Sequence, residues 1–195
     1  MNRKKFILGT LLLPPITLIA KVNNNISMFF EKEIIMRTAK GFKVNSGEAR
    51  FGGKYKMKGV TLNNLDIKIS GKDTDGELAV FEQTGYTPNG GPPFHIHINQ
   101  DEWFFITEGE YLFQVGEERY SMKAGETIFL PRNIPHAFIQ LTEKAKTIVS
   151  YLPAGKMEDF FKTTDSWATP PSKEEITKAF EDNGMKIVGP PLKIE

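Results

Sequence analysis

Residues 41–152 alternate between short apolar runs and clusters of turn-forming residues, and this pattern constrains the fold more than any other feature. The turn clusters recur at roughly 8–12 residues, a spacing typical of an all-β sandwich or barrel. The segment 63–70 alternates polar and apolar side chains with period two, as a half-buried strand does. We therefore predict an all-β domain over residues 41–152. Further strands are expected at 78–82, 95–97, 103–107, 111–115, 127–130, 136–141 and 147–152.

The segment that follows, residues 153–195, predicts a short helical extension. Residues 156–162 have the pattern of a short amphipathic helix. Ser172 and Glu175 form the capping-box pattern, with Ser172 as the N-cap of a second helix and Gly184 as its stop. Because the extension is too small to be an independent domain, we expect it to pack on the barrel.

Residues 1–20 have the composition of an export signal. A basic head is followed by an apolar run that extends from Phe6 to Ala20. The run is short for a membrane span and contains a Pro-Pro pair, so no membrane span is expected in the mature chain. We predict a periplasmic or secreted protein with residues 21–40 as a linker. An uncleaved anchor and a cytosolic start are the alternatives.

Charge and cysteine content exclude several functions. The chain has 25 basic and 24 acidic residues, which gives a formal net charge of +1. A nucleic-acid partner is not expected, because such proteins usually show a basic patch and a high isoelectric point. The absence of cysteine excludes disulfides, thiolate metal sites and thiol nucleophiles.

All three histidines of the chain fall into one pattern with Glu102. His95 and His97 are two residues apart on a predicted strand, so their side chains point to the same face, about 7 Å apart. Glu102 follows at an odd spacing that would place it on the opposite face of a straight strand. The polar residues 99–101 supply a bend that resets this parity and lets Glu102 join the pair.

The third histidine, His136, is remote in sequence. Residues 125–136 predict a turn, a strand, a rigid loop and the start of another strand, with Pro131 and Pro135 fixing the entry of that strand. A barrel can bring this strand beside the first histidine pair. The predicted metal ligands are His95, His97, Glu102 and His136.

These residues resemble the two sequence motifs of the cupin family. The first motif is carried by His95, His97, Glu102 and Gly109, and the second by Gly125, Pro131, Asn133, His136 and Gln140. Three positions depart from the motifs. Gly90 stands one residue closer to the first histidine than usual, Asn133 replaces a glycine, and Gln140 replaces an asparagine. Asparagine tolerates the same left-handed backbone. The resemblance implies a double-stranded β-helix, the jelly-roll barrel.

The nearer resemblance is to small single-domain cupins that look like quercetin 2,3-dioxygenases. Residues 91–97, 131–138, 153–161 and 187–192 carry this resemblance. It implies that a metal chelates an enolic oxygen of a flavonol and that Glu102 accepts the proton as the catalytic residue. By the same analogy, a homodimer formed through edge strands is an alternative to a monomer.

Neutral imidazoles and one carboxylate suit a divalent transition metal, and Fe, Mn, Co, Ni, Cu and Zn all remain open. Four protein ligands in an octahedral arrangement would leave two adjacent positions for a substrate and dioxygen, or for a substrate and water. A structural zinc site would be closed, tetrahedral and usually richer in sulfur. The ligand set therefore favours chemistry or ligand capture.

Three functions follow from this set. The first is a metal-dependent dioxygenase-like enzyme acting on an enolic or phenolic small molecule. The second is a non-catalytic metal or small-ligand-binding protein of the cell envelope. The third is a metal-assisted isomerase or epimerase, which would need a further acid or base from Glu, Tyr or Lys, because all three histidines are used on the metal.

Strand parity also predicts the walls of the site. Phe104 shares parity with Glu102, while Phe138 and Gln140 share parity with His136, so these three side chains are expected to line a substrate pocket. The pair Phe160 and Phe161 is expected to pack the helix on the barrel, with a lid over the barrel mouth as the alternative.

Overall fold

The computed structural model describes residues 37–194. The predicted export signal at residues 1–20 and most of the predicted linker at 21–40 lie outside the described residues, so export stays a prediction. Among the described residues, no helix combines the length and the apolar character that a membrane crossing requires.

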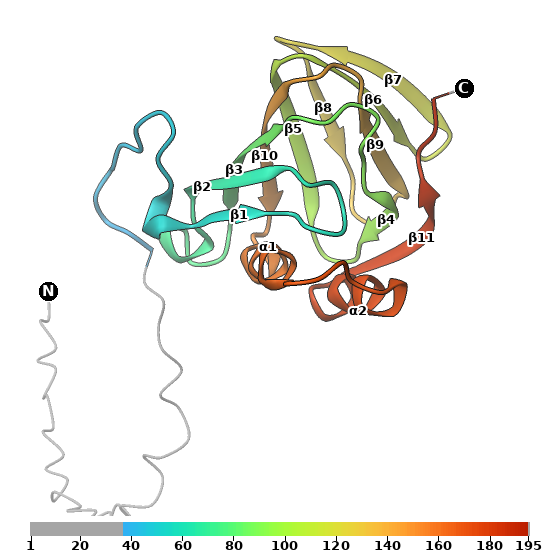
Figure 1. The fold of residues 1–195 in the computed structure, drawn as a ribbon. Helices are drawn as coiled ribbons and strands as arrows, with labels where there is room; N and C mark the ends of the chain where they lie inside the picture. Colours follow the sequence, from blue (N-terminus) through green and yellow to red (C-terminus); the bar gives the residue numbers. More distant parts are fainter. Residues whose placement is uncertain (1–36, 195) are drawn as a thin grey trace, which may run out of the picture. The chain divides into compact units, whose positions relative to one another are not determined.

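Two antiparallel sheets face each other and form the predicted double-stranded β-helix, so the all-β fold is confirmed (Figure 1). In order across the sheet, the six-stranded sheet contains β1 (Lys54–Lys56), β2 (Asn64–Ile69), β3 (Ala79–Gly85), β10 (Ala145–Leu152), β5 (Asp101–Glu108) and β8 (Thr127–Leu130). The five-stranded sheet contains β11 (Met185–Pro191), β4 (Pro93–His97), β9 (His136–Gln140), β6 (Glu110–Val115) and β7 (Glu118–Lys123).

The core lies between the sheets because the strands alternate buried and exposed side chains, as their sequences predict. Along β5, Glu102, Phe104 and Ile106 are buried, while the residues between them are partly exposed. Burying one large apolar side chain contributes about 1.5–3 kcal/mol. The edge-to-face aromatic pairs of the core add to this contribution. The most fully buried aromatic side chains of the core are Phe81, Phe104, Tyr111, Phe113, Phe161 and Phe180.

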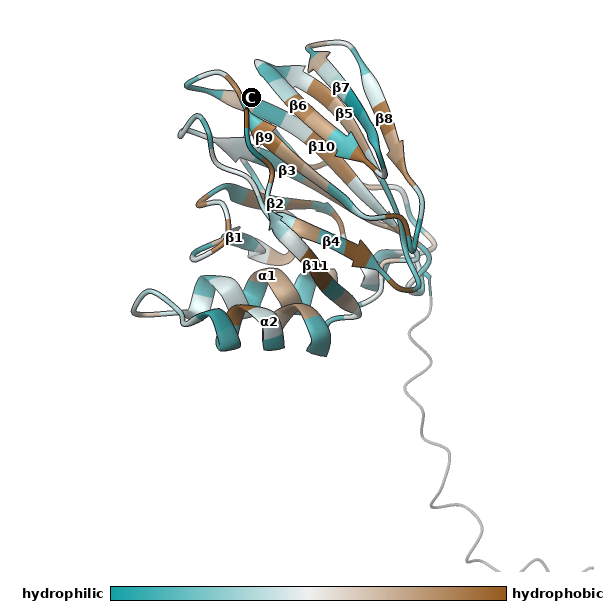
Figure 2. Cartoon of the chain, turned by 90° about the vertical axis from the view of Figure 1, so that its right-hand side faces the viewer, coloured by the Kyte–Doolittle hydropathy of each residue, from teal (hydrophilic) through white to brown (hydrophobic). Residues whose placement is uncertain are grey.

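Two helices lie side by side at one end of the barrel: α1 (Met157–Ser166) and α2 (Lys173–Asp182) (Figures 1 and 2). The predicted capping box is confirmed, because the Ser172 hydroxyl accepts from the Glu175 backbone and the Glu175 carboxylate accepts from the Ser172 backbone at 2.7 Å. Figure 2 shows that the helices turn polar surface outward. Their buried side chains include Met157, Phe160, Phe161, Ala179 and Phe180.

Three strands were not expected. β1 is short, and β7 has a single buried residue, so neither carries an alternating apolar pattern. β11 ends in Pro190 and Pro191, which disfavour a strand interior. It nevertheless pairs with β4, with Ile187 opposite His95. The C-terminal extension is therefore helical with one added strand, and that strand borders the predicted metal ligands.

Close contact between β9 and the loop that precedes β4 requires a glycine at position 91. A Cβ atom on Gly91 would stand 1.8 Å from the Phe138 carbonyl oxygen, whereas one on Gly90 would have its nearest neighbour at an ordinary 3.5 Å. We expect Gly91→Ala to lower the free energy of unfolding by about 1–3 kcal/mol or more, because the backbone of β9 must move.

Gly90→Ala is the matched control for this prediction and should change stability little. Urea denaturation of both variants measures the difference. Equal losses in the two variants would contradict the role assigned to Gly91.

Candidate metal centre

The topology brings four side chains from three strands to one point between the sheets. His95 and His97 lie on β4, His136 begins β9, and the β4–β9 pairing sets His95 directly opposite His136. Glu102 lies on β5 in the facing sheet. The bend at residues 98–100 carries the chain from one sheet to the other, which resets the side-chain parity as the sequence predicted.

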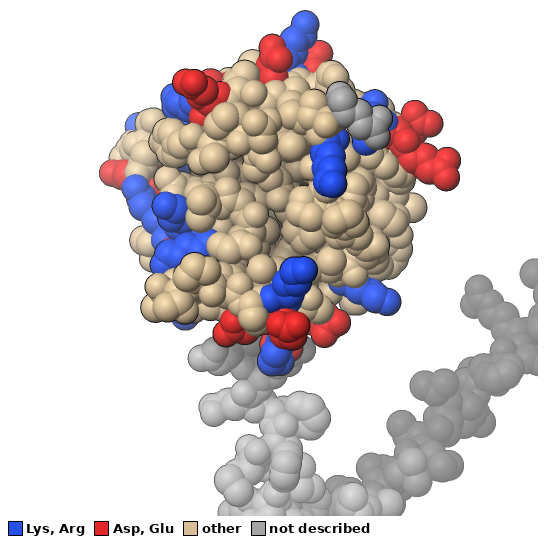
Figure 3. Space-filling model, turned by 45° about the vertical axis from the view of Figure 1, so that its right-hand side comes forward, with Lys and Arg blue, Asp and Glu red and all other residues tan. Residues whose placement is uncertain are grey.

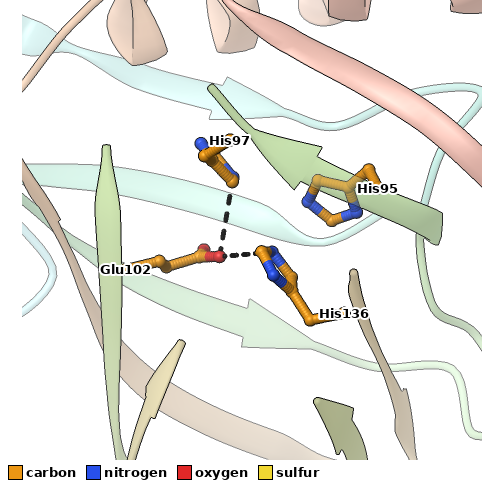
Figure 4. A group of neighbouring side chains, drawn as sticks. All are labelled: His95, His97, Glu102 and His136. Atoms are coloured by element: carbon orange, nitrogen blue, oxygen red, sulfur yellow. Dashed lines mark ion pairs between the residues drawn. The ribbon is translucent and has the colours of Figure 1, made fainter. Parts of the chain in front are cut away.

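The four side chains point toward one another, as Figure 4 shows. Their candidate ligand atoms all lie within 4.8 Å of one another, and all four residues are buried. Glu102 Oε2 is 3.2 Å from His136 Nε2 and 3.6 Å from His97 Nε2. The rings of His97 and His136 stack with an interplanar angle of 11°. This geometry gives three nitrogens and one carboxylate around a single centre.

The Nδ1 atom of each imidazole lies within hydrogen-bond distance of an oxygen acceptor. His95 Nδ1 lies 2.8 Å from the Pro93 carbonyl, His136 Nδ1 lies 2.9 Å from the Ile134 carbonyl, and His97 Nδ1 lies 3.2 Å from Gln100 Oε1. Because these oxygens only accept, each Nδ1 donates and carries the proton. The Nε2 atoms are left with free lone pairs, which is the state of a metal-ligating histidine.

Two electron-rich atoms face each other inside this cluster. His136 Nε2 is buried and has no hydrogen-bond partner among the described residues, although the Glu102 carboxylate is only 3.2 Å away. An unprotonated nitrogen and a carboxylate oxygen repel each other in a buried site unless a cation satisfies both. The residues present therefore fit a bound divalent transition metal.

Burial keeps the three imidazoles neutral. Loss of hydration is the largest cause in each case, and it lowers the pKa of His95, His97 and His136 from 6.5 to about 4. The Glu102 carboxylate works in the opposite direction on His95 and His97. The histidines are consequently in the metal-binding form at neutral pH.

The cluster opens into a small cavity of about 30 Å³. Phe104 and Phe138 line it, at the positions that strand parity predicts. Gln140 is not among the lining residues, although its parity matches that of His136. It lies at the far end of β9, where its amide donates to the carbonyls of Thr142 (2.8 Å) and Glu143 (3.3 Å). Its side chain is thus taken up by the loop after β9.

Several lining residues were missed by sequence reasoning. Tyr151 lies opposite Glu102 in the β5–β10 register and reaches the cavity. Burial, and then the nearby Glu102 carboxylate, raise the pKa of the Tyr151 phenol well above its ordinary value. Tyr151 stands two residues after the buried Val149, so strand parity indicated an inward side chain. Its pairing with Glu102 is a long-range contact that the sequence alone does not give. Further wall residues are Met57, Val60, Gln83, Pro92, Met157, Phe180 and Met185.

Phe160 and Phe161 pack α1 on the barrel, as expected from the sequence. Both are buried by helix packing, and both line the cavity from α1. Phe180 of α2 closes another side, with its ring 5.3 Å from that of His95. The extension therefore supplies part of the wall around the candidate metal centre.

Comparison with known proteins agrees with this fold and site. Residues 84–151 match the family model of the cupin domain, and all four clustered side chains lie within that stretch. Together with the double-stranded β-helix, the match identifies a cupin domain in this part of the chain.

Individual relatives are distant. An uncharacterized protein of Methanocaldococcus jannaschii is 36% identical over 42 residues, which is 22% of this chain and 34% of that protein. The match thus spans about a third of that relative's length. A predicted oxalate decarboxylase from Thermotoga maritima has a TM-score of 0.50 at 14% identity, covering 57% of this chain and 99% of its own.

An RmlC-like cupin from Shewanella frigidimarina has a TM-score of 0.47 at 16% identity, covering 61% of this chain and 96% of its own. At this level of identity, structural likeness shows the fold alone. The resemblance to quercetin 2,3-dioxygenase-like proteins stays a prediction.

The depressed histidine pKa values predict a pH dependence for the metal-free protein. The folded value of about 4 lies below the ordinary 6.5, so the unfolded chain binds more protons between these two pH values. We expect the free energy of unfolding to be highest above pH 6.5, as far as these groups contribute, and to fall as the pH drops toward 4. Urea denaturation in the presence of a chelator at several pH values measures this.

His136→Gln removes one of the three titrating groups and serves as the comparison. Its stability should depend less steeply on pH over the same window. An identical slope in the variant and the parent would show that the buried imidazoles do not cause the dependence.

Proposed function

We propose that this protein is a metal-dependent enzyme that acts on an enolic or phenolic small molecule in the manner of a dioxygenase. The observation that carries the proposal is the buried cluster of three imidazoles and one carboxylate facing a single cavity. One divalent transition metal would be held by His95, His97, Glu102 and His136. When bound, such an ion supplies Lewis-acid activation of a substrate oxygen.

Glu102 is the base in this proposal. It is the one carboxylate of the cluster, and it is buried at 4% exposure. A carboxylate in this position can accept the proton of a substrate hydroxyl that enters the cavity. The neutral histidines cannot take this role, since each Nδ1 is already protonated and each Nε2 faces the metal position.

The walls support an aromatic or planar substrate. Phe104, Phe138, Phe160, Phe161 and Phe180 all border the cavity and make much of its wall apolar. Aromatic faces and edges also pair well with a planar ring. Figure 3 shows one face of the protein, on which charged side chains of both signs lie mainly toward the edge.

Cavity size imposes a condition on this proposal. A volume of about 30 Å³ accommodates only a water-sized ligand, so a phenolic ring must lie partly elsewhere or displace a wall. Val60 borders both this cavity and a neighbouring groove of about 370 Å³. Ile176 of α2 and Ile187 of β11 line that groove. In the proposal, the groove takes the body of the substrate and its hydroxyl passes Val60.

Two alternatives each have one supporting observation. The small cavity favours a non-catalytic protein of the cell envelope that binds a metal or a small ligand. The Tyr151 phenol at the cavity wall supplies the additional acid or base that an isomerase or epimerase needs. The experiment below separates all three.

The test measures oxygen consumption with a flavonol and with a catechol, after elemental analysis of the natively expressed protein. We expect turnover only in the metal-loaded form. His136→Ala should lose the bound metal, and with it the activity, because the site keeps only two imidazoles. Glu102→Gln should retain more metal than His136→Ala but lower the turnover rate by about 10²–10⁴-fold, since it removes the base.

Other outcomes redirect the assignment. Ligand binding without turnover under any metal would support the envelope binding protein. Conversion of a sugar or keto acid under nitrogen would support the isomerase. A wild-type protein that binds no transition metal at all would overturn the proposed function in every form.

A further inference from the structure

We propose that Gln100 is a positioning residue that sets the tautomer and ring orientation of His97 and ties this ligand to the segment that starts α1. The proposal rests on the metal-binding function argued above. It concerns a side chain that no motif of the sequence singled out.

The orientation of the Gln100 amide is forced by its contacts. Gln100 lies on the bend between β4 and β5 and is 3% exposed. Its Nε2 donates to the carbonyl oxygens of Pro153 at 3.0 Å and Ala154 at 2.8 Å. These two bonds use both amide hydrogens, and a flipped amide would aim its oxygen at two carbonyl oxygens. Oε1 must therefore face His97.

The forced amide has a direct consequence for His97. Oε1 can only accept, so the His97 Nδ1 atom, 3.2 Å away, must donate. The proton is held on Nδ1, and the Nε2 lone pair is directed at the metal position. Without Gln100, a buried neutral imidazole could place its proton on either nitrogen, and the tautomer with the proton on Nε2 cannot bind a metal there.

His97 differs from the other two histidines in the origin of this acceptor. His95 and His136 donate to backbone carbonyls, those of Pro93 and Ile134, each two residues earlier in the chain. A side-chain substitution cannot remove a backbone carbonyl. Of the three histidines, His97 is therefore the one whose tautomer can be freed from its constraint by substituting its hydrogen-bond partner, Gln100.

The loop before α1 is shaped around the same amide. Gly155 has a φ of 54°, and a Cβ atom on it would stand 2.5 Å from Gln100 Nε2. Glycine is required for this close approach. The loop continues into α1, whose Phe160 and Phe161 line the cavity. One amide thus connects a candidate metal ligand with the helix that forms part of the cavity wall.

The chain offers a matched control in Gln140. It is buried to a similar degree, and its amide likewise donates to two loop carbonyls, those of Thr142 and Glu143. It has no hydrogen bond to any of the three histidines. Gln140→Met and Gln100→Met therefore remove comparable anchors of a loop, but only Gln100→Met removes the acceptor of a ligand.

The experiment records imidazole ¹⁵N–¹H correlation spectra of the metal-free protein labelled at histidine. With three histidines in the chain, the spectrum holds three ring systems. We expect all three to be protonated at Nδ1 in the wild type and in Gln140→Met. In Gln100→Met, one ring should change to a mixture of tautomers. Metal affinity, from competition with a chelator, should fall by about 10- to 100-fold in Gln100→Met alone.

The proposal is overturned if folded Gln100→Met keeps three Nδ1-protonated rings, or if Gln140→Met changes the rings equally. Should Gln100→Met fail to fold, Gly155→Ala displaces the amide while leaving it in the chain, and its spectrum decides by the same criterion. The spectrum needs no metal. If the wild-type protein bound no metal, the proposed function would be wrong, but the role of Gln100 in fixing the His97 tautomer would still be tested by the spectrum.

Discussion

The burial of four polar side chains in an apolar barrel is the constraint on which the rest of this structure depends. Unpaired polar groups in such a place cost several kilocalories per mole, so each buried atom needs a partner. The three Nδ1 atoms have oxygen acceptors, but His136 Nε2 has no hydrogen-bond partner among the described residues and faces the Glu102 carboxylate at 3.2 Å. A bound cation would resolve this conflict, so the four residues fit a metal centre.

The path of the chain meets this constraint by crossing between the sheets. If β4 ran on straight into β5, Glu102 would point away from His97. Side chains alternate between the two faces of a strand, and Glu102 is an odd number of residues, five, after His97. The bend at residues 98–100 instead moves the chain to the facing sheet, and Glu102 approaches the histidines from the opposite side. Gln100, buried inside that bend, supplies the acceptor for His97, so the residues that redirect the chain also orient a ligand.

Local periodicity predicted much of this fold, and long-range pairing accounts for what it missed. The strand at 127–130 and the capping box at Ser172 were predicted because their signals lie within a few residues. The ligand cluster was found because all three histidines stand in motif spacings. β7 shows no alternation because only one of its residues is buried. Tyr151 reaches the site only through the pairing of β10 with β5, which no local pattern reveals.

The barrel supplies the candidate metal ligands, whereas the C-terminal extension supplies part of the cavity wall. All four candidate ligands come from strands of the barrel, whereas the extension contributes Phe160, Phe161 and Phe180 to the walls and β11 to the sheet beside His95. A change in the helices would alter the size and shape of the cavity without removing a ligand. The cavity has room only for a water-sized molecule, and side chains of both helices and Val60 are among those that border it. Access to the candidate metal centre therefore depends in part on residues outside the two cupin motifs.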